Sequence, residues 1–129
     1  MSEIINPQDA ELEEVILGSC LIESKAITLI ADILRPEAFY NEKNLEIYAT
    51  LQSMYRNGQK IDIITVKEEL TRRGKLEFIG GPYTLAHISG RVASSAHLEY
   101  HARILKQKYI RRETILGFHK LLALSLIHI

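Results

Sequence analysis

The sequence has little of what secreted, disulfide-stabilised or membrane-spanning proteins need. It contains one cysteine, Cys20, so no disulfide can form within the chain, and a lone thiol fits a reducing compartment. The N-terminus is acidic and has no positively charged segment ahead of an apolar run, so no signal peptide is expected. The longest apolar run, LLALSLIHI, is far shorter than the roughly 20 residues that span a bilayer. We therefore expect a cytoplasmic protein that does not associate with membranes.

Charge is divided unevenly along the chain, although the formal net charge is zero. Residues 1–99 carry 15 acidic and 10 basic side chains, a balance of −5, whereas residues 100–129 carry 1 acidic and 6 basic ones, a balance of +5. A domain built to grip DNA usually has a net positive face. An acidic body with a basic C-terminal segment fits association between protein surfaces better.

Helical periodicity dominates the sequence and predicts an all-α fold. The 129 residues suit one domain with its own core, and we expect residues 1–93 to form a compact, orthogonal helical head. Asn6 is the expected N-cap of the first helix, and Asn41 is the expected N-cap of a later one. Thr65 and Glu68 match a capping box, in which each side chain satisfies a free amide at the start of a helix.

The stretch KLEFIGGPYTLAHI, residues 75–88, contains paired glycines that could belong to a phosphate-binding loop. Such loops follow a buried strand and usually place a lysine after the glycines, and neither feature is present here. Proline is accepted in the first turn of a helix. We therefore expect Gly80, Gly81 and Pro82 to form a structural turn. The helix that follows should face the core with Tyr83, Leu85 and Ile88.

Beyond Gly90 the pattern predicts one long helix, residues 94–124, that protrudes from the head. A narrow apolar seam follows it at helical spacing, and the seam consists of Leu98, Ala102, Leu105, Tyr109 and Leu116. Some 28 residues of helix span roughly 42 Å, whereas a body of 100 residues has a radius of gyration of only about 13 Å. The helix should therefore overhang the head, and we expect its seam to be covered by a second copy of the chain.

No group of residues has the pattern of a catalytic, cofactor or metal site. His97 and His101 lie one helical turn apart, but no third ligand shares their side of the helix. The basic side chains of the long helix spread over more than one face, which favours a solvated surface or an acidic neighbour over nucleic acid. The residues alone indicate an interaction domain without an active site. The alternative is a winged-helix or helix-turn-helix DNA-binding domain, with residues 65–73 as one helix and KLEFIGGPY as the wing.

The order of several motifs resembles the N-terminal domain of DnaB-type replicative DNA helicases. The matching segments are PQDAELEEVILGSCLIE, FYNEKNLEIYATLQSMYRNGQKIDIITVKEEL, GGPYTLAHI and AHLEYHARILKQKYIRRETI. They lie between about Pro7 and Leu122, and their order and spacing are more specific than any one of them. In this family the paired glycines form a structural corner, and a histidine is frequent where this chain has Asn44.

The resemblance implies a compact head followed by a helical hairpin, of which the long helix is the first arm and the second arm is missing. Paired domains would build a collar, a trimer of dimers, on a hexameric motor. Primase would dock on the collar through its C-terminal domain, and a helicase loader is a further candidate partner. ATP and Mg²⁺ would belong to a motor domain outside this chain, and DNA would be reached only through the full-length ring. This chain is expected to have no catalytic activity and no cofactor of its own.

The C-terminal segment departs from the family pattern. A second hairpin helix is expected after LLAL, whereas the sequence continues with the apolar, uncharged residues SLIHI. We expect residues 125–129 to form a non-native or disordered tail.

Overall fold

The computed structural model describes residues 7–127, and all of its regular elements in that range are helical. They are α1 (Pro7–Ile22), α2 (Ile27–Ile30), the 3₁₀ helix η1 (Pro36–Ala38), α3 (Glu42–Arg56), α4 (Ile63–Arg72), α5 (Pro82–Gly90) and α6 (Leu98–Ile127). The all-α prediction is confirmed. The winged-helix form of the DNA-binding alternative is wrong for these residues, because the segment that would form the wing folds as turns followed by the start of α5.

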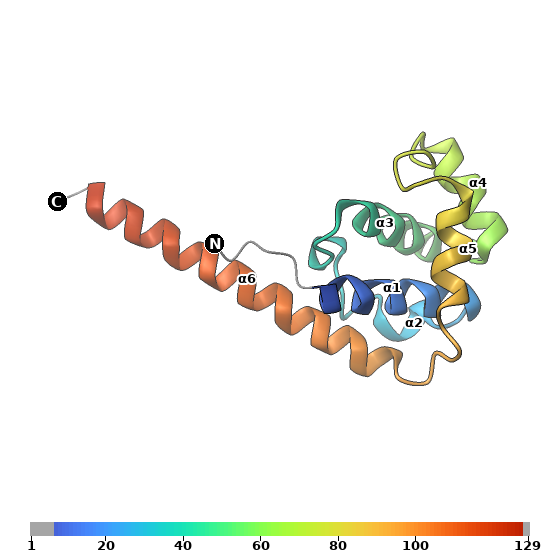
Figure 1. Ribbon diagram of the computed structural model, residues 1–129, viewed down its shortest axis with the longest axis horizontal. Coiled ribbons are helices and arrows are strands. Elements are labelled where there is room, and N and C mark those ends of the chain that lie inside the picture. Colours follow the sequence, from blue (N-terminus) through green and yellow to red (C-terminus); the bar gives the residue numbers. More distant parts are fainter. Residues whose placement is uncertain (1–6, 128–129) are drawn as a thin grey trace.

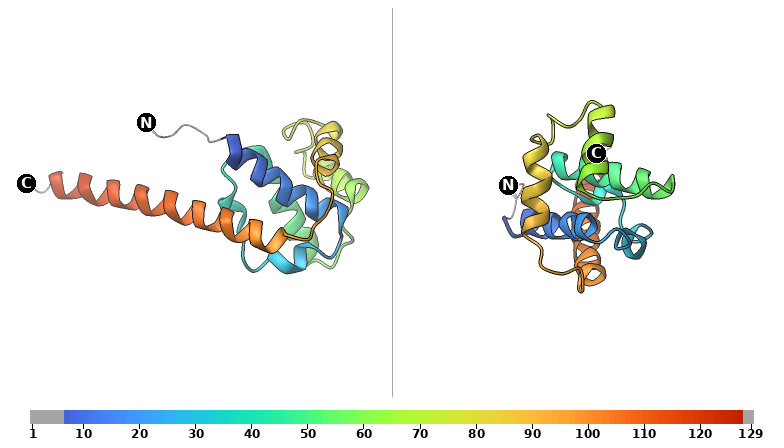
Figure 2. Two further views of the ribbon diagram at one scale, coloured as in Figure 1. Left: turned by 60° about the horizontal axis from the view of Figure 1, so that its bottom comes forward. Right: turned by 90° about the vertical axis from the view of Figure 1, so that its right-hand side faces the viewer.

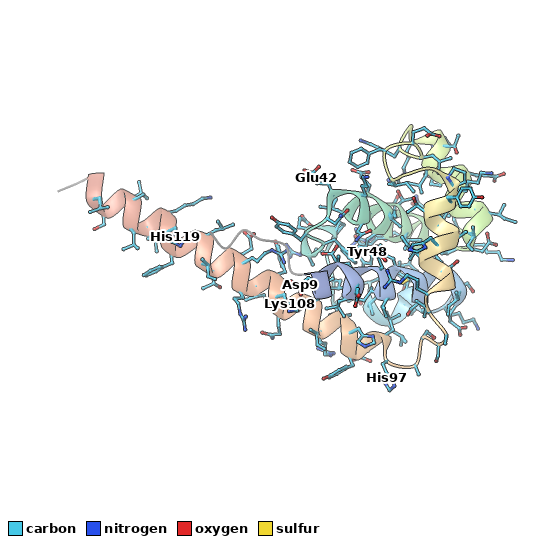
Figure 3. All side chains as sticks on the ribbon, in the orientation of Figure 1. Asp9, Glu42, Tyr48, His97, Lys108 and His119 are labelled. Atoms are coloured by element: carbon cyan, nitrogen blue, oxygen red, sulfur yellow. The ribbon has the colours of Figure 1, made fainter. Side chains whose placement is uncertain are left out.

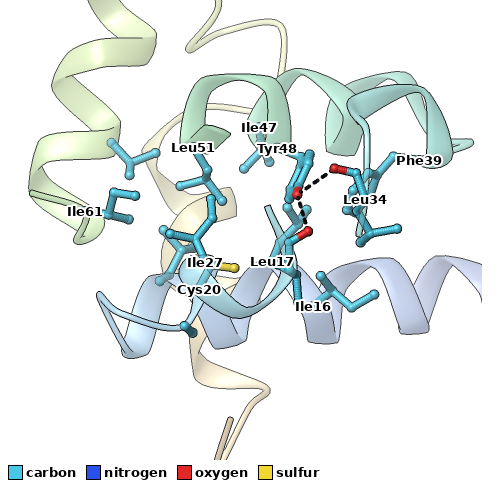
Figure 4. Close-up of a cluster of buried hydrophobic side chains, with 14 of the residues drawn as sticks. Ile16, Leu17, Cys20, Ile27, Leu34, Phe39, Ile47, Tyr48, Leu51 and Ile61 are labelled. Carbon is cyan, nitrogen blue, oxygen red and sulfur yellow. Dashed lines mark hydrogen bonds between the residues drawn. The ribbon is translucent and has the colours of Figure 1, made fainter. Parts of the chain in front are cut away.

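The head is built around α1, which packs against α3, α5 and α6. In Figure 1 α5 runs across the direction of α1, and α4 lies on the far side of the head from the C-terminus. Apolar side chains from several helices meet in one cluster (Figure 4), and its central members include Ile16, Leu17, Ile27, Ile47 and Leu51. This single cluster is what makes the head one folded unit.

Tyr48 lies inside this cluster with its polar end satisfied. Its ring stacks on the ring of Phe39, with centroids 4.8 Å apart, and its hydroxyl donates a hydrogen bond to the Leu34 carbonyl at 3.0 Å (Figure 4). Burial raises the pKa of the Tyr48 hydroxyl, which therefore stays protonated. Burial also raises the pKa of the nearby Cys20 thiol to about 12, so this cysteine is a packing residue and not a nucleophile.

Two of the expected helix caps can be compared with the structure. Asn41 is the N-cap of α3, where its side chain accepts hydrogen bonds from the amides of Lys43 and Asn44. The capping box expected at Thr65 and Glu68 is wrong, because α4 begins at Ile63. The expected N-cap Asn6 lies outside the described residues.

The box at the start of α4 is formed by Asp62 and Thr65 instead. The Asp62 carboxylate accepts from the Thr65 amide at 2.8 Å, and the Thr65 hydroxyl accepts from the Asp62 amide at 2.9 Å. Aspartate is at least as good an N-cap as threonine, so the earlier start satisfies the amides of Asp62 and Thr65 by the same reciprocal pattern. Glu68 is left as an exposed residue of the helix.

The paired glycines form a tight turn into α5. Gly80 and Gly81 have φ values of 110° and 84°, a region that side-chain-bearing residues rarely adopt, and Pro82 is the first residue of the helix. Leu85 and Ile88 are buried as expected. The expectation for Tyr83 is wrong: its side chain is 86% exposed, because it lies in the first turn of α5 on the side away from the core.

Candidate interaction surface

The seam of α6 lies in two different environments. Leu98, Ala102 and Leu105 are buried within the head of the same chain, and Tyr109 packs against the edge of that core. These residues are therefore not available to a second copy, and the expectation that the whole seam mediates self-association is wrong. The physical reason is that α6 starts at Leu98 alongside the head and follows α1 before it leaves the body. Only Leu116, which is 52% exposed, lies on a part of the seam that the head does not cover.

The part of α6 beyond the head, residues 113–127, is here called the arm. Every residue from 113 to 126 is exposed, and Figure 1 and the left view of Figure 2 show this part of the helix extending away from the head. Its exposed apolar side chains are Ile115, Leu116, Phe118, Leu121, Leu122, Leu124 and Leu126. A group of large apolar side chains on one continuous exposed segment marks an interaction site in a soluble protein.

The root of the arm is tied to the head by two cationic side chains. The Lys108 ammonium lies 2.9 Å from a carboxylate oxygen of Asp9 on α1, and the two labels are adjacent in Figure 3. One turn further on, Arg112 donates a hydrogen bond to the Ala38 carbonyl at 3.2 Å. The Arg112 guanidinium also lies over the ring of Tyr40, at 5.2 Å from its centroid. The head therefore holds α6 as far as Arg112.

A buried carboxylate, Glu13, organises the turn that receives Arg112. It accepts hydrogen bonds from the Tyr40 amide at 2.6 Å, the Asn41 amide at 3.4 Å and the Asn44 side-chain amide at 2.9 Å. Burial has the largest effect on the Glu13 carboxyl and raises its pKa, while these hydrogen bonds act in the opposite direction. This residue was not predicted as a site. Its position three and four residues before Ile16 and Leu17, on the buried face of α1, was the available signal.

The candidate chemical groups do not converge. The rings of His97 and His101 have centroids 6.3 Å apart, and partial burial, with a smaller effect of His97, lowers the pKa of His101. Within residues 7–127 no three histidine, cysteine or carboxylate side chains are close enough together to hold a metal ion. None of the helices in this range combines the length and apolar character needed to cross a membrane. The most prominent surface feature is therefore the apolar arm.

A helical head that carries an uncovered apolar helix is typical of a domain that binds other proteins. The comparisons with known proteins agree with this class. Residues 5–107 match the model of the family described as DnaB-like helicase N terminal domain. The chain belongs to this family.

Two curated relatives illustrate how much of a longer protein the chain represents. It is 43% identical over 108 residues to the replicative DNA helicase DnaB of Rhodothermus marinus, covering 84% of this chain and 12% of that protein. It is 33% identical over 119 residues to the replicative DNA helicase DnaC of Bacillus subtilis, covering 89% of this chain and 26% of that protein. The chain thus spans about an eighth to a quarter of the length of these relatives.

Solved structures show the same fold. The crystal structure of the N-terminal domain of DnaB helicase from Mycobacterium tuberculosis matches with a TM-score of 0.86 and 31% identity, over 93% of this chain and 87% of that one. A DnaB-like replicative helicase, described together with its interactions with primase, matches with a TM-score of 0.78 and 28% identity, over 92% of this chain and 28% of that one.

Proposed function

We propose that this chain is the N-terminal interaction domain of a replicative DNA helicase and that it pairs with a second copy of itself through the arm. Membership of the DnaB-like helicase N terminal domain family gives the context. The observation that carries the proposal is the exposed apolar surface of residues 113–126. Complete burial of a leucine, isoleucine or phenylalanine side chain contributes about 1.5–3 kcal/mol, so leaving several of them in water has a considerable free-energy cost.

The spacing of the arm residues supports a neighbour on more than one side. Leu116 continues the line of the seam, four residues after Arg112 and seven after Tyr109. Ile115, Phe118 and Leu122 follow one another at spacings of three and four and lie on a different side of the helix. A helix with two apolar sides is buried between other helices and not against one flat surface. Pairing with a second copy, whose arm carries the same two sides, fits this pattern.

In the complete protein these pairs would assemble into a hexameric collar, a trimer of dimers, above a motor domain that binds ATP and Mg²⁺. The head would then be free to receive primase through the primase C-terminal domain, and a helicase loader is a further candidate. Two observations support this wider proposal: the relatives are replicative helicases, and one structural match was described with primase. The isolated domain would neither hydrolyse ATP nor unwind DNA.

Sedimentation velocity over a range of concentrations tests the pairing, and a pull-down with the C-terminal domain of the cognate primase tests the docking. We expect the average mass to rise towards that of a dimer with increasing concentration, and primase to be retained at low salt. A folded protein that stays monomeric at every concentration would contradict the pairing. A folded protein that retains no primase would contradict the docking, independently of the first result.

A further inference from the structure

The head holds α6 by two kinds of contact that follow each other along the helix. In the section from Leu98 to Leu105, the side chains that face the head are apolar and buried: Leu98, Ala102 and Leu105. In the section from Lys108 to Arg112, the contacts with the head are polar and aromatic, and the three side chains that make them, Lys108, Tyr109 and Arg112, are only partly buried. From residue 113 to residue 126 every side chain is exposed. The second section is therefore the last part of the head that can control the direction of the arm.

Arg112 is the outermost residue of this section. Its guanidinium lies 5.2 Å from the centroid of the Tyr40 ring and 5.8 Å from that of the Tyr109 ring, within the range of cation–π attraction to both. It also donates to the carbonyl of Ala38, the last residue of η1, at 3.2 Å. One side chain of α6 thus contacts its own helix and the turn between η1 and α3.

Both anchoring points on the head are connected to α1. Asp9 faces Lys108 directly, and Glu13, one turn further along α1, accepts the Tyr40 amide and so fixes the backbone that carries the Tyr40 ring. Lys108 and Arg112 are likewise one turn apart on α6. Two successive turns of α1 are therefore linked to two successive turns of α6. Asp9 contacts Lys108 directly, whereas Glu13 is linked to Arg112 through Tyr40.

We propose that Asp9, Tyr40, Lys108, Tyr109 and Arg112 form a shoulder clamp that fixes the direction of the arm and can open without unfolding the head. Opening breaks the Lys108–Asp9 ion pair, the Arg112 contacts with Ala38 and Tyr40, and the packing of Tyr109 against the edge of the core. The side chains that open are already partly exposed to water, so the lost polar contacts are exchanged for hydration at a small cost. The apolar contacts at Leu98, Ala102 and Leu105 remain in place. The part of α6 beyond Leu105 then lifts away from the head. This device goes beyond the pairing proposed above, since it sets the angle between a head and its own arm.

The test is the distance distribution between spin labels on the head and on the arm, measured by pulsed electron paramagnetic resonance. Glu68→Cys on α4 and His119→Cys on the arm are exposed labelling positions remote from the clamp, and the native Cys20 is buried. Dilution of the labelled protein with excess unlabelled protein removes distances between copies. We expect one narrow distribution for the otherwise unchanged protein and a distinctly broader one for Arg112→Gln.

Arg111→Gln is the matched control, because it removes the same charge from the neighbouring, exposed position. A second pair, Lys108→Gln with the control Lys106→Gln, tests the contact with Asp9 in the same way. The clamp is supported if only the Arg112 and Lys108 variants broaden the distribution while the urea unfolding midpoint stays within a few tenths of a molar of the parent. The idea is overturned if Arg112→Gln is as narrow as Arg111→Gln. It is equally overturned if Arg112→Gln lowers the midpoint as much as Leu105→Ala does, since the contact would then belong to the core.

Discussion

The two halves of α6 share one apolar seam but lie in opposite environments. Leu105 in the first half is completely buried, whereas Leu116 in the second half is 52% exposed, although both lie on one line along the helix. The first half completes the hydrophobic core of the head, and the second half has no neighbour within the described residues. One section of a single apolar seam therefore stabilises the fold, and the next section is exposed and is the part to which we assign the proposed association.

The largest contrast should appear when the two leucines are truncated. Leu105→Ala removes buried methyl groups and leaves a cavity, so it should lower the free energy of unfolding by about 2–5 kcal/mol. Leu116→Ala removes exposed atoms and should change the stability of the monomer by no more than about 0.5 kcal/mol. Urea denaturation of both variants at low protein concentration measures the difference. Equal effects would show that the arm is packed against its own head.

A smaller effect is expected at the carboxylate that organises the base of α6. Glu13→Gln replaces one of the two accepting oxygens with an NH2 group, so either the Tyr40 amide, which donates to Oε2, or the Asn44 side chain, which donates to Oε1, loses its acceptor. A buried donor without a partner costs about 1–3 kcal/mol, so the free energy of unfolding should fall by that amount. Denaturant titration checks this value, with Glu11→Gln, an exposed carboxylate on the same helix, as the control. A loss no greater than that of the control would mean that Glu13 does not secure the turn.

The turn into α5 offers a way to destabilise the head without affecting the arm. Gly81 has φ 84° and ψ −179°, a region essentially restricted to glycine, so Gly81→Ala should cost about 1–3 kcal/mol. Gly90→Ala is the control, because a Cβ there meets no other atom within 4 Å and alanine favours the helix. Thermal denaturation measures the stability of the two variants. The dimerisation constants of both should match the parent, and a weakened dimer in Gly81→Ala alone would show that head and arm are coupled.

The smallest effect concerns acid stability at the start of α4. The pKa of Asp62 is lowered, mainly because its carboxylate accepts a hydrogen bond from the Thr65 amide. The ionised form therefore stabilises the fold above the ordinary pKa near 3.8, and this contribution disappears as the pH falls through the lower folded-state value. Asp62→Asn keeps an N-cap acceptor but does not titrate. Between about pH 5 and about pH 3 the parent should lose slightly more stability than this variant, whereas parallel curves would argue against the assigned cap.

The sequence was sufficient for local features whose cause is itself local. Asn41 as an N-cap, the glycine turn before Pro82 and the helical class follow from side-chain chemistry within a few residues. The predicted N-cap of α4, Thr65, lies three residues after the observed one, Asp62. Both side chains can accept a hydrogen bond from a backbone amide, and packing decides which of them begins the helix.

Features that depend on distant contacts were not predictable in this way. Periodicity shows that one side of α6 is apolar, but it does not show whether the head or another chain covers that side. The burial of Leu105, the exposure of Tyr83 and the role of Glu13 all follow from how separate helices meet. The arm is the exception, because its length alone predicts that it extends beyond the head.

The most direct measurement is the mass of the double variant Leu116→Asp/Leu122→Asp by sedimentation equilibrium. Both residues are exposed and outside the core, so the head should keep the unfolding midpoint of the parent. We predict that this variant remains monomeric at concentrations where the parent and the control Gln107→Asp form dimers. A variant that dimerises as tightly as the parent would contradict the assignment of self-association to the arm.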